Sequence, residues 1–377
     1  MEQESKQKPW GLLTAAGVLV LGLLLALVLS QDTAQAASSA VVLDLPRVQS
    51  AAAPAAALEA GHKVIPLGRA VGIKLFSDGV LVVGLSDLET QAGSISPGRR
   101  CGLKAGDIIT HINGQEVDTI EEVQAILKED GAQPLTLQAC RSGKAMQLSV
   151  QAVANEQGTY QLGVWLRDSM AGIGTMTFYD PDSRLFAALG HGINDVDTSL
   201  LMPLETGNIM YASVSDVKKG TSGDPGELHG SFDVCRDLGT LYANTQRGIY
   251  GVLTCDDFDS DSQAVEVASR DQVKVGPAVI LSNISGETVE EYTIEITHVY
   301  PESAGETRNL MIQVTDPKLL EQTGGIVQGM SGSPILQDGR LVGAVTHVLI
   351  NDPSRGYGIL AENMVEQTAY EEHSAVS

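Results

Sequence analysis

Positively charged residues are scarce in this chain of 377 residues. It has 24 lysines and arginines against 47 aspartates and glutamates, which gives a formal net charge of −23. A protein that binds nucleic acid neutralises phosphate groups with clustered lysine and arginine. The charge balance therefore argues against nucleic acid as a partner and otherwise indicates only an acidic, soluble protein.

Cysteines are also few. The chain has four of them, and no two have C-x-x-C spacing, so the sequence gives no support for a bound metal ion. It also has no P-loop and no dinucleotide-binding G-x-G-x-x-G motif, and we expect no metal and no organic cofactor. Cys235 and Cys255 could pair in an oxidising compartment, but the sequence favours free, mostly buried thiols.

Aromatic side chains make up only 4% of the residues, whereas glycine occurs 40 times. Valine, isoleucine and leucine occur in many short runs, a pattern that favours β-strands over a helical bundle. The length suffices for two or three domains with a well-buried core. We therefore expect a mainly β fold with more than one domain.

The N-terminal region contains a long apolar segment. Lys6 and Lys8 precede an uncharged run over residues 10–29, which is long enough to span a bilayer. The flanking lysines favour a cytoplasmic N-terminus, and the tripeptide AQA at residues 34–36 resembles a signal-peptidase site. We predict that residues 1–36 are a cleaved signal or a retained membrane anchor that exports the rest of the chain. Residues 37–60, rich in alanine, serine and proline, are predicted to be a linker.

A small domain is expected over residues 61–155. Its apolar runs predict strands at residues 73–76, 80–85, 108–112, 135–139 and 146–150, and residues 119–128 have helical periodicity. The stretch SPGRRCGLKAGDIITHINGQEV, residues 96–117, resembles a PDZ domain of the kind attached to secreted peptidases. PDZ domains bind an extended chain end as an added strand and hold its carboxylate on backbone N–H groups. The loop that matches this role is expected at Val71, Gly72 and Ile73, although a purely structural PDZ domain is the alternative.

A second domain is expected over residues 156–377. Its short apolar runs are separated by glycine and by aspartate or asparagine clusters, a spacing that suits one or two β-barrels. Two six-stranded barrels would fit its length. The expected strands are at residues 160–165, 173–179, 185–189, 209–214, 248–253, 279–282, 291–299 and 311–314, followed by a final hairpin.

That hairpin follows a candidate nucleophile. The stretch GIVQGMSGSPIL, residues 325–336, has a serine between glycines, and glycine adopts the positive φ values that a tight, exposed turn requires. A serine nucleophile also needs backbone N–H groups that converge on the oxyanion, and those of Gly329 and Ser331 are the candidates. The pattern resembles the GDSGGP sequence of chymotrypsin-like serine peptidases, with Met330 and Ser333 as departures. A glycine-rich and serine-rich hairpin without chemistry is the alternative.

A serine nucleophile usually needs a histidine base and an acid that orients it. Of seven histidines, His191 is the best candidate, because it follows the apolar run 185–189 and lies between two glycines, where a barrel strand reaches the rim. His347, in the strand after the nucleophile hairpin, is the rival base, or else contacts substrate.

In combination, these motifs resemble the SpoIVB peptidase family. They are the apolar N-terminus, the PDZ domain, GHGIND at residues 190–195, GGIVQGMSGSPI at residues 324–335, GAVTHV at residues 343–348 and NDPSRGYGI at residues 351–359. The resemblance implies a chymotrypsin-like serine endopeptidase with Ser331 as nucleophile and His191 as base. It also implies a sporulation signalling protease, secreted from the forespore into the space between its two membranes. Such a protease cleaves itself and a membrane-bound regulator, which releases an intramembrane metalloprotease that processes a late mother-cell sigma factor.

The family pattern points to Asp316, 15 residues before Ser331, as the orienting acid (331 − 316). Asp316 could instead line the specificity pocket or cap a short helix at residues 317–322. Asp195 and Asp197 are closer to His191 in sequence and are competing candidates.

Two other functions are compatible with this organisation. An exported PDZ adaptor with a degenerate, non-catalytic protease domain is one. A housekeeping quality-control protease is the other, but such enzymes carry the PDZ domain after the protease domain rather than before it, so the order of the motifs argues against it.

Overall fold

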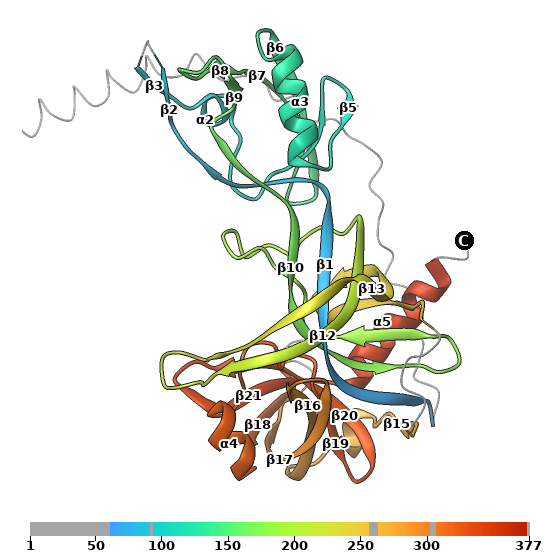
Figure 1. Ribbon diagram of the computed structural model, residues 1–377. Coiled ribbons are helices and arrows are strands. Elements are labelled where there is room, and N and C mark those ends of the chain that lie inside the picture. The colour runs from blue at the N-terminus through green and yellow to red at the C-terminus, as the bar shows by residue number, and fades with distance from the viewer. Residues whose placement is uncertain (1–60, 91–92, 256–262, 302–306, 375–377) are drawn as a thin grey trace, which may run out of the picture. The chain divides into compact units, whose positions relative to one another are not determined.

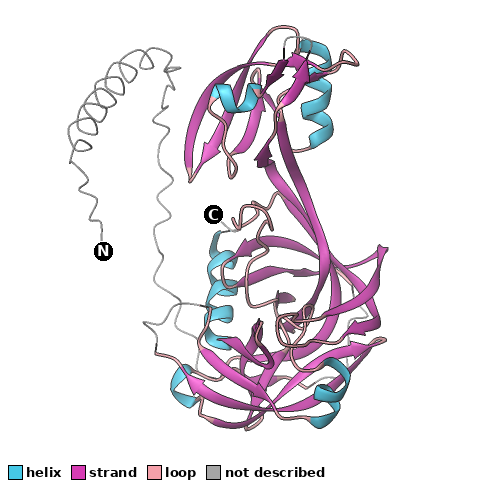
Figure 2. Cartoon of the chain, turned by 90° about the vertical axis from the view of Figure 1, so that its left-hand side faces the viewer, coloured by secondary structure: helices cyan, strands magenta, loops and turns pink. Residues whose placement is uncertain are grey.

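The computed structural model describes residues 61–90, 93–255, 263–301 and 307–374 (Figure 1). The predicted signal or anchor at residues 1–36 and the predicted linker at residues 37–60 lie outside the described residues. Within the described ranges, no helix is both long enough and apolar enough to cross a membrane. Strands dominate the described chain, and the few helices are short (Figure 2).

The first barrel has six strands. β1 pairs with β10 on one side and β12 on the other, and the ladder continues through β11, β14 and β13, which closes the sheet on itself. Fully buried side chains such as Val71, Phe186 and Ile249 fill its interior. The strands are β1 (Lys63–Leu85), β10 (Val164–Tyr179), β11 (Leu185–Ala188), β12 (Thr206–Lys218), β13 (Glu227–Thr245) and β14 (Gly248–Leu253).

The second barrel is also closed and six-stranded, in the order β16-β17-β18-β21-β20-β19 (Figure 1). Its core includes the fully buried Ile280, Ile312 and Val345. The strands are β16 (Gly276–Ser285), β17 (Thr288–Val299), β18 (Leu310–Val314), β19 (Pro334–Gln337), β20 (Arg340–Leu349) and β21 (Asp352–Leu360). The predicted mainly β fold with two six-stranded barrels is therefore confirmed.

Four short elements accompany the barrels. Helix α5 (Ala361–Ser374) forms two ion pairs, one between Glu366 and Arg247 of the β13–β14 turn and one between Glu362 and Arg270, which lies before the second barrel. The other three are β15 (Val265–Glu266), the 3-10 helix η1 (Arg270–Gln272) and helix α4 (Pro317–Thr323).

A PDZ-like unit lies between β1 and β10 in the sequence. Its core is built around fully buried apolar residues such as Val80, Ile109 and Leu137. Helix α3 begins with a capping box in which Thr119 and Glu122 each accept a backbone N–H. The elements are β2 (Leu88–Thr90), β3 (Gly93–Ile95), α2 (Pro97–Cys101), β4 (Ile108–Ile112), β5 (Gln115–Glu116), α3 (Ile120–Asp130), β6 (Pro134–Arg141), β7 (Lys144–Gln151), β8 (Val153–Ala154) and β9 (Tyr160–Gln161).

The expected loop at residues 71–73 is wrong. Val71, Gly72 and Ile73 lie inside β1, where they pair with β10 and β12 of the first barrel. Only the later part of β1, at Val80 and Leu81, pairs with β4 of the PDZ-like unit. The PDZ-like unit is therefore an insertion between two barrel strands, and the start of residues 61–155 belongs to the peptidase barrel.

Candidate active site

Ser331 lies on a turn that only glycines can flank. Gly329 has φ +99° and Gly332 has φ +98°, values that side chains with a Cβ rarely adopt. A Cβ at position 332 would lie 2.1 Å from the carbonyl oxygen of Thr175, so this glycine also permits a close approach between the two barrels. The departures from GDSGGP are structural, because Met330 is buried in the core of the second barrel and the Ser333 hydroxyl contacts that of Ser282.

The backbone of this turn leaves two N–H groups available. Those of Met330, Gly332 and Ser333 each donate to a backbone carbonyl oxygen. Those of Gly329 and Ser331 donate to no backbone carbonyl in the described part of the chain. Two such donors beside a serine hydroxyl are what an oxyanion hole requires, and they are the two that the sequence pointed to.

Thr175 of β10 holds this turn from the first barrel. Its backbone N–H donates to the Ser331 carbonyl at 3.1 Å, and its hydroxyl donates to the Gly329 carbonyl at 2.8 Å. Both carbonyl oxygens are thereby fixed, which fixes the adjoining peptide units. Thr175 was not identified from the sequence, since nothing in its local pattern shows a contact 154 residues away.

His191 follows β11 on a bend, after Leu189 and Gly190, which both have positive φ. Its Nδ1 lies 2.8 Å from the carbonyl oxygen of Gly192. A proton on Nδ1 satisfies that carbonyl and leaves Nε2 as the acceptor that a general base needs. Burial lowers the pKa of His191, an effect that the Gly192 carbonyl partly offsets, so the imidazole is neutral at pH 7.

Ser331 and His191 come together on one cavity of about 280 Å³, together with Gly329. In this structure the Ser331 hydroxyl donates to the Thr346 carbonyl oxygen at 2.8 Å. No hydrogen bond joins this hydroxyl to His191 among the described residues, and catalytic hydrogen bonds often form only when substrate binds. The structure therefore places Ser331, His191 and Gly329, the predicted nucleophile, base and oxyanion donor, on one cavity, with the Ser331 hydroxyl bonded to Thr346.

His347 is the neighbour of His191 rather than an isolated rival. It follows Thr346 on β20, and the two imidazole ring centroids are 5.3 Å apart. Its Nδ1 is buried and has no hydrogen-bond partner among the described residues. Burial, with further contributions from the charges of His191 and Arg308, lowers the pKa of His347 to about 4. His347 is therefore uncharged at neutral pH.

The structure does not bring Asp316 to the imidazole. One carboxylate oxygen accepts the N–H groups of Lys318 and Leu319 at the start of α4, and the other accepts that of Thr293 at 3.3 Å. Asp316 thus caps a helix, one of the alternatives that the sequence left open. Its role as orienting acid stays a prediction from the family pattern, and the contacts seen here favour the capping role instead.

The two nearer carboxylates are also engaged elsewhere. Asp195 and Asp197 both pair with Arg167, and Asp195 also accepts the N–H and hydroxyl of Thr198. Within the described ranges no carboxylate hydrogen-bonds to His191, and the Gly192 carbonyl is the group on its Nδ1.

Asn244 of β13 supports the segment after His191. Its side chain accepts the N–H of Ile193 at 2.8 Å and donates to the carbonyl oxygens of Ile193 and Met202, each at 2.9 Å. These bonds hold the backbone two residues beyond the base. Asn244 lies 51 residues from Ile193, and no sequence motif indicates the contact.

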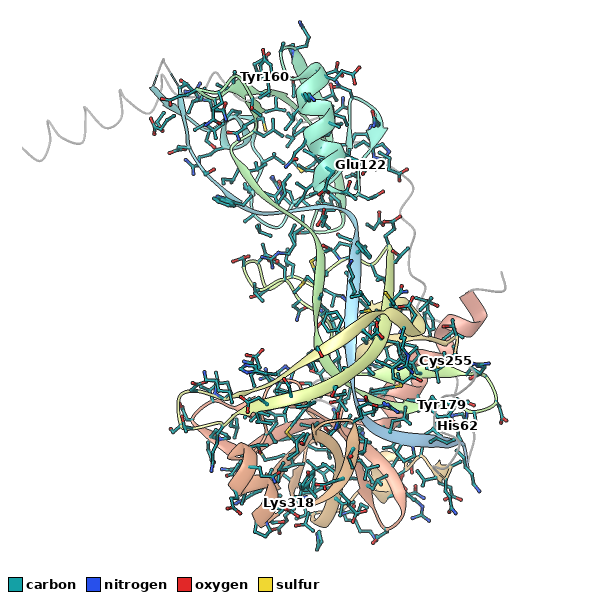
Figure 3. All side chains as sticks on the ribbon, viewed as in Figure 1. His62, Glu122, Tyr160, Tyr179, Cys255 and Lys318 are labelled. Atoms are coloured by element: carbon teal, nitrogen blue, oxygen red, sulfur yellow. The ribbon has the colours of Figure 1, made fainter. Side chains whose placement is uncertain are left out.

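The PDZ-like unit has its own apolar groove, of about 820 Å³. One wall is helix α3, with Ile120, Val123 and Leu127, and the other is the stretch of residues 158–166. Glu122 on the helix and Tyr160 on the opposite stretch mark these elements in Figure 3. The run Leu162-Gly163-Val164, in which Gly163 has φ +67°, forms part of the wall opposite α3.

The expectation for the cysteines is confirmed only in part. Cys101, Cys140 and Cys235 are free thiols, but of these three only Cys101 is buried, and Cys235 is exposed. A Cys235–Cys255 disulfide is therefore not formed in this structure.

Comparisons with known proteins agree with this geometry. The family model described as SpoIVB peptidase S55 matches residues 158–365, and a PDZ domain model matches residues 90–141. No curated protein matches the chain.

Several solved structures resemble parts of the chain. One is the active form of the Rv3671c protease of M. tuberculosis, with 17% identity, 53% of this chain and 74% of that chain covered, and a TM-score of 0.30. Another is the PDZ domain of an SdrC-like protein of Listeria monocytogenes. It has 22% identity and a TM-score of 0.20, and the match covers 24% of this chain and 87% of that chain. TM-scores this low support no inference, and the fold rests on the strand pairings.

The family match covers more than half of the 377 residues and contains both His191 and Ser331. The chain therefore belongs to the SpoIVB peptidase S55 family and is a serine endopeptidase.

Proposed function

We propose that this endopeptidase is a sporulation signalling protease that cleaves itself and then a membrane-bound regulator of an intramembrane metalloprotease. The observation that carries the proposal is that His191 and Ser331, from different barrels, line one cavity with the free N–H groups of Gly329 and Ser331. The family resemblance supplies the biological setting.

The proposed reaction passes through an acyl-enzyme. His191 Nε2 takes the proton of the Ser331 hydroxyl as the oxygen attacks the peptide carbonyl. The N–H groups of Gly329 and Ser331 bind the oxyanion. His191 then gives its proton to the leaving amine, and water repeats the sequence on the ester. The lowered pKa of His191 suits the first step, because the base is already neutral at pH 7.

Export is part of the proposal. The apolar run at residues 10–29 would carry the following domains out of the forespore and hold them at the membrane until self-cleavage in the linker. The protein substrates would then be reached in the space between the two forespore membranes.

The PDZ-like unit would bind a chain end of a substrate or of the protein's own processed N-terminal region. An extended peptide would add as a strand beside residues 162–166, with its side chains against Val123 and Leu127 of α3. This role would control access to the peptidase rather than contribute to the chemistry.

The first test follows intact mass over time for the wild type and Ser331→Ala, both with residues 1–60 present. We expect the wild type to shorten within the linker and Ser331→Ala to remain whole. Ser222→Ala is the matched control, because Ser222 is an exposed serine outside the cavity, and its hydroxyl donates to the Asn351 carbonyl. Equal shortening of all three proteins would assign the cleavage to host proteases. A folded wild type that neither shortens nor reacts with a fluorophosphonate would favour the non-catalytic adaptor.

A further inference from the structure

The cavity beside Ser331 extends well beyond the reacting atoms. Apart from the predicted catalytic groups and the polar side chain of Gln328, its wall is dominated by apolar side chains from the first barrel, and it contains no lysine, arginine, aspartate or glutamate. These apolar residues are Ile73, Met170, Ile173, Leu189 and Ile193. At about 280 Å³ it lies just below the range of pockets that hold whole small molecules, roughly 300–1,000 Å³. It has room for one large side chain.

The position of the cavity indicates which half of a peptide it receives. The leaving amine takes its proton from His191 and must therefore pass this imidazole. The cavity continues past His191 to Ile193 and to Met170 of β10. No residue of β20, the strand that carries Thr346 and His347, is among those that line it. The cavity thus lies on the leaving-group side of the scissile bond.

The chemistry of the wall determines what fits. A charged side chain placed there would lose part of its hydration without gaining a partner of opposite charge, since Gln328 can offer only a neutral amide, and this loss is costly. An apolar side chain would exchange water for contact with Ile73, which is 4% exposed, and Leu189, which is 6% exposed. A large apolar side chain is therefore the occupant that the wall stabilises.

We propose, building on the proposed function, that this cavity is a specificity subsite for a large apolar side chain, such as leucine or phenylalanine, just after the scissile bond. Its natural occupant is a protein substrate with such a residue at that position. Peptides with a small or an acidic residue there are poor substrates.

Gly172 offers a way to close the subsite. It pairs directly with Ile73 across the β1–β10 ladder, so a side chain at position 172 would share the face of the sheet with Ile73. A Cβ at this glycine would meet no atom within 4 Å, and its φ is not positive. Gly172→Val should fold and reduce the space, with Gly172→Ala as the smaller step. Met170→Ala is the opposite change, because it enlarges the subsite.

The test uses acyl transfer, which does not depend on the unknown acyl-side preference. The full chain is acylated at Ser331 with p-nitrophenyl acetate, which releases p-nitrophenol. Amino-acid amides then compete with water for the acyl-enzyme. The amine attacks the ester from the leaving-group side, because it reverses the departure of an amine. It forms an N-acetyl amide and returns the proton to Ser331. The amides are those of leucine, phenylalanine, alanine and aspartate.

We expect the leucine and phenylalanine amides to be captured about tenfold or more better than those of alanine and aspartate. Gly172→Val should bring the ratio of leucine-amide to alanine-amide capture close to one, and Gly172→Ala should lower this ratio less. Met170→Ala should raise the ratio of phenylalanine-amide to leucine-amide capture. Equal capture of all four amides by the wild type, or the same ratios in all variants, would overturn the subsite. If no p-nitrophenol is released and Ser331 is not acylated, the proposed function itself fails, a separate and distinguishable result.

Discussion

Asp316 allows a sharp test of how the catalytic imidazole is oriented. In the structure its carboxylate caps α4 by accepting the N–H groups of Lys318 and Leu319, at 2.9 Å and 3.0 Å, and contacts that of Thr293. Asparagine is as good an N-cap as aspartate, whereas alanine has no acceptor. Asp316→Asn therefore preserves the cap through its one amide oxygen but removes the charge and the acceptor of the Thr293 N–H, while Asp316→Ala removes all of these.

The expected magnitudes follow from these contacts. Loss of an N-cap costs about 0.5–2 kcal/mol, and Asp316→Ala should lie in the upper half of this range because a third N–H also loses its acceptor. For a domain of this size that is a fall in Tm of about 2–8 °C. Asp316→Asn keeps the cap and loses the interaction of a charge with the helix dipole, about 0.3–1 kcal/mol, together with the long contact from the Thr293 N–H. Because neither side chain touches His191, we expect kcat/KM to stay within about threefold of the wild type.

A triad acid would behave differently. Replacement of that aspartate by asparagine presents the wrong imidazole tautomer and lowers kcat by about 10⁴. The assay is p-nitrophenyl ester hydrolysis by all three proteins at 25 °C, with Tm measured on the same samples. An Asp316→Asn protein that unfolds at the wild-type temperature but has lost about 10³ or more of kcat/KM would refute the capping assignment.

Three further predictions concern the same site. Thr175→Val should lower kcat/KM about tenfold or more with little change in KM, because the Gly329 carbonyl loses its donor. Thr175→Ser keeps the hydroxyl and should retain activity. Equal activity of the two variants would show that this hydroxyl does not position the turn. Because the folded-state pKa of His347 is about 4 and the unfolded value is about 6.5, stability should fall by up to about 3 kcal/mol as the pH falls from 6.5 to 4. In urea unfolding, the free energy of unfolding of His347→Gln should fall less steeply over this pH range than that of the wild type. An equally steep fall would show that His347 does not cause the loss of stability. Asn244→Ala releases the backbone next to His191, so kcat should fall even at temperatures where the fall in Tm leaves the variant fully folded. If kcat is lost only where the variant unfolds, Asn244 has a purely structural role.

The local patterns of the sequence predicted much of this molecule. Short apolar runs predicted strands that the structure contains, such as residues 248–253, which match β14. Ser331 and Gly329 could be identified because a nucleophile turn is a continuous motif. His191 could be identified because a strand and two glycines mark its position. These features depend on neighbours in the chain, and the sequence alone contains them.

The failures have a common physical origin in contacts between distant residues. Gly72 was interpreted as a loop glycine, but it lies in a strand where a Cβ would fall 2.3 Å from the Cβ of Phe232, so the glycine permits a close approach inside the barrel. The strand β13 was not predicted, because residues 231–237 are mostly exposed and polar. Thr175 and Asn244 act through bonds to segments far away in sequence, for which no local pattern exists.

The insertion of the PDZ-like unit has a consequence for how the chain folds. Phe76 pairs with Ser169, 93 residues later (169 − 76), and the first barrel cannot close until these two strands meet. In an unfolded chain, closing a loop of that length costs about 4 kcal/mol of entropy. Once the inserted unit has folded around β1 and β10, its two ends are already adjacent and most of that cost is gone. We expect the inserted unit to nucleate the barrel, so that mutations in its core slow refolding of the peptidase even where they leave the catalytic residues untouched.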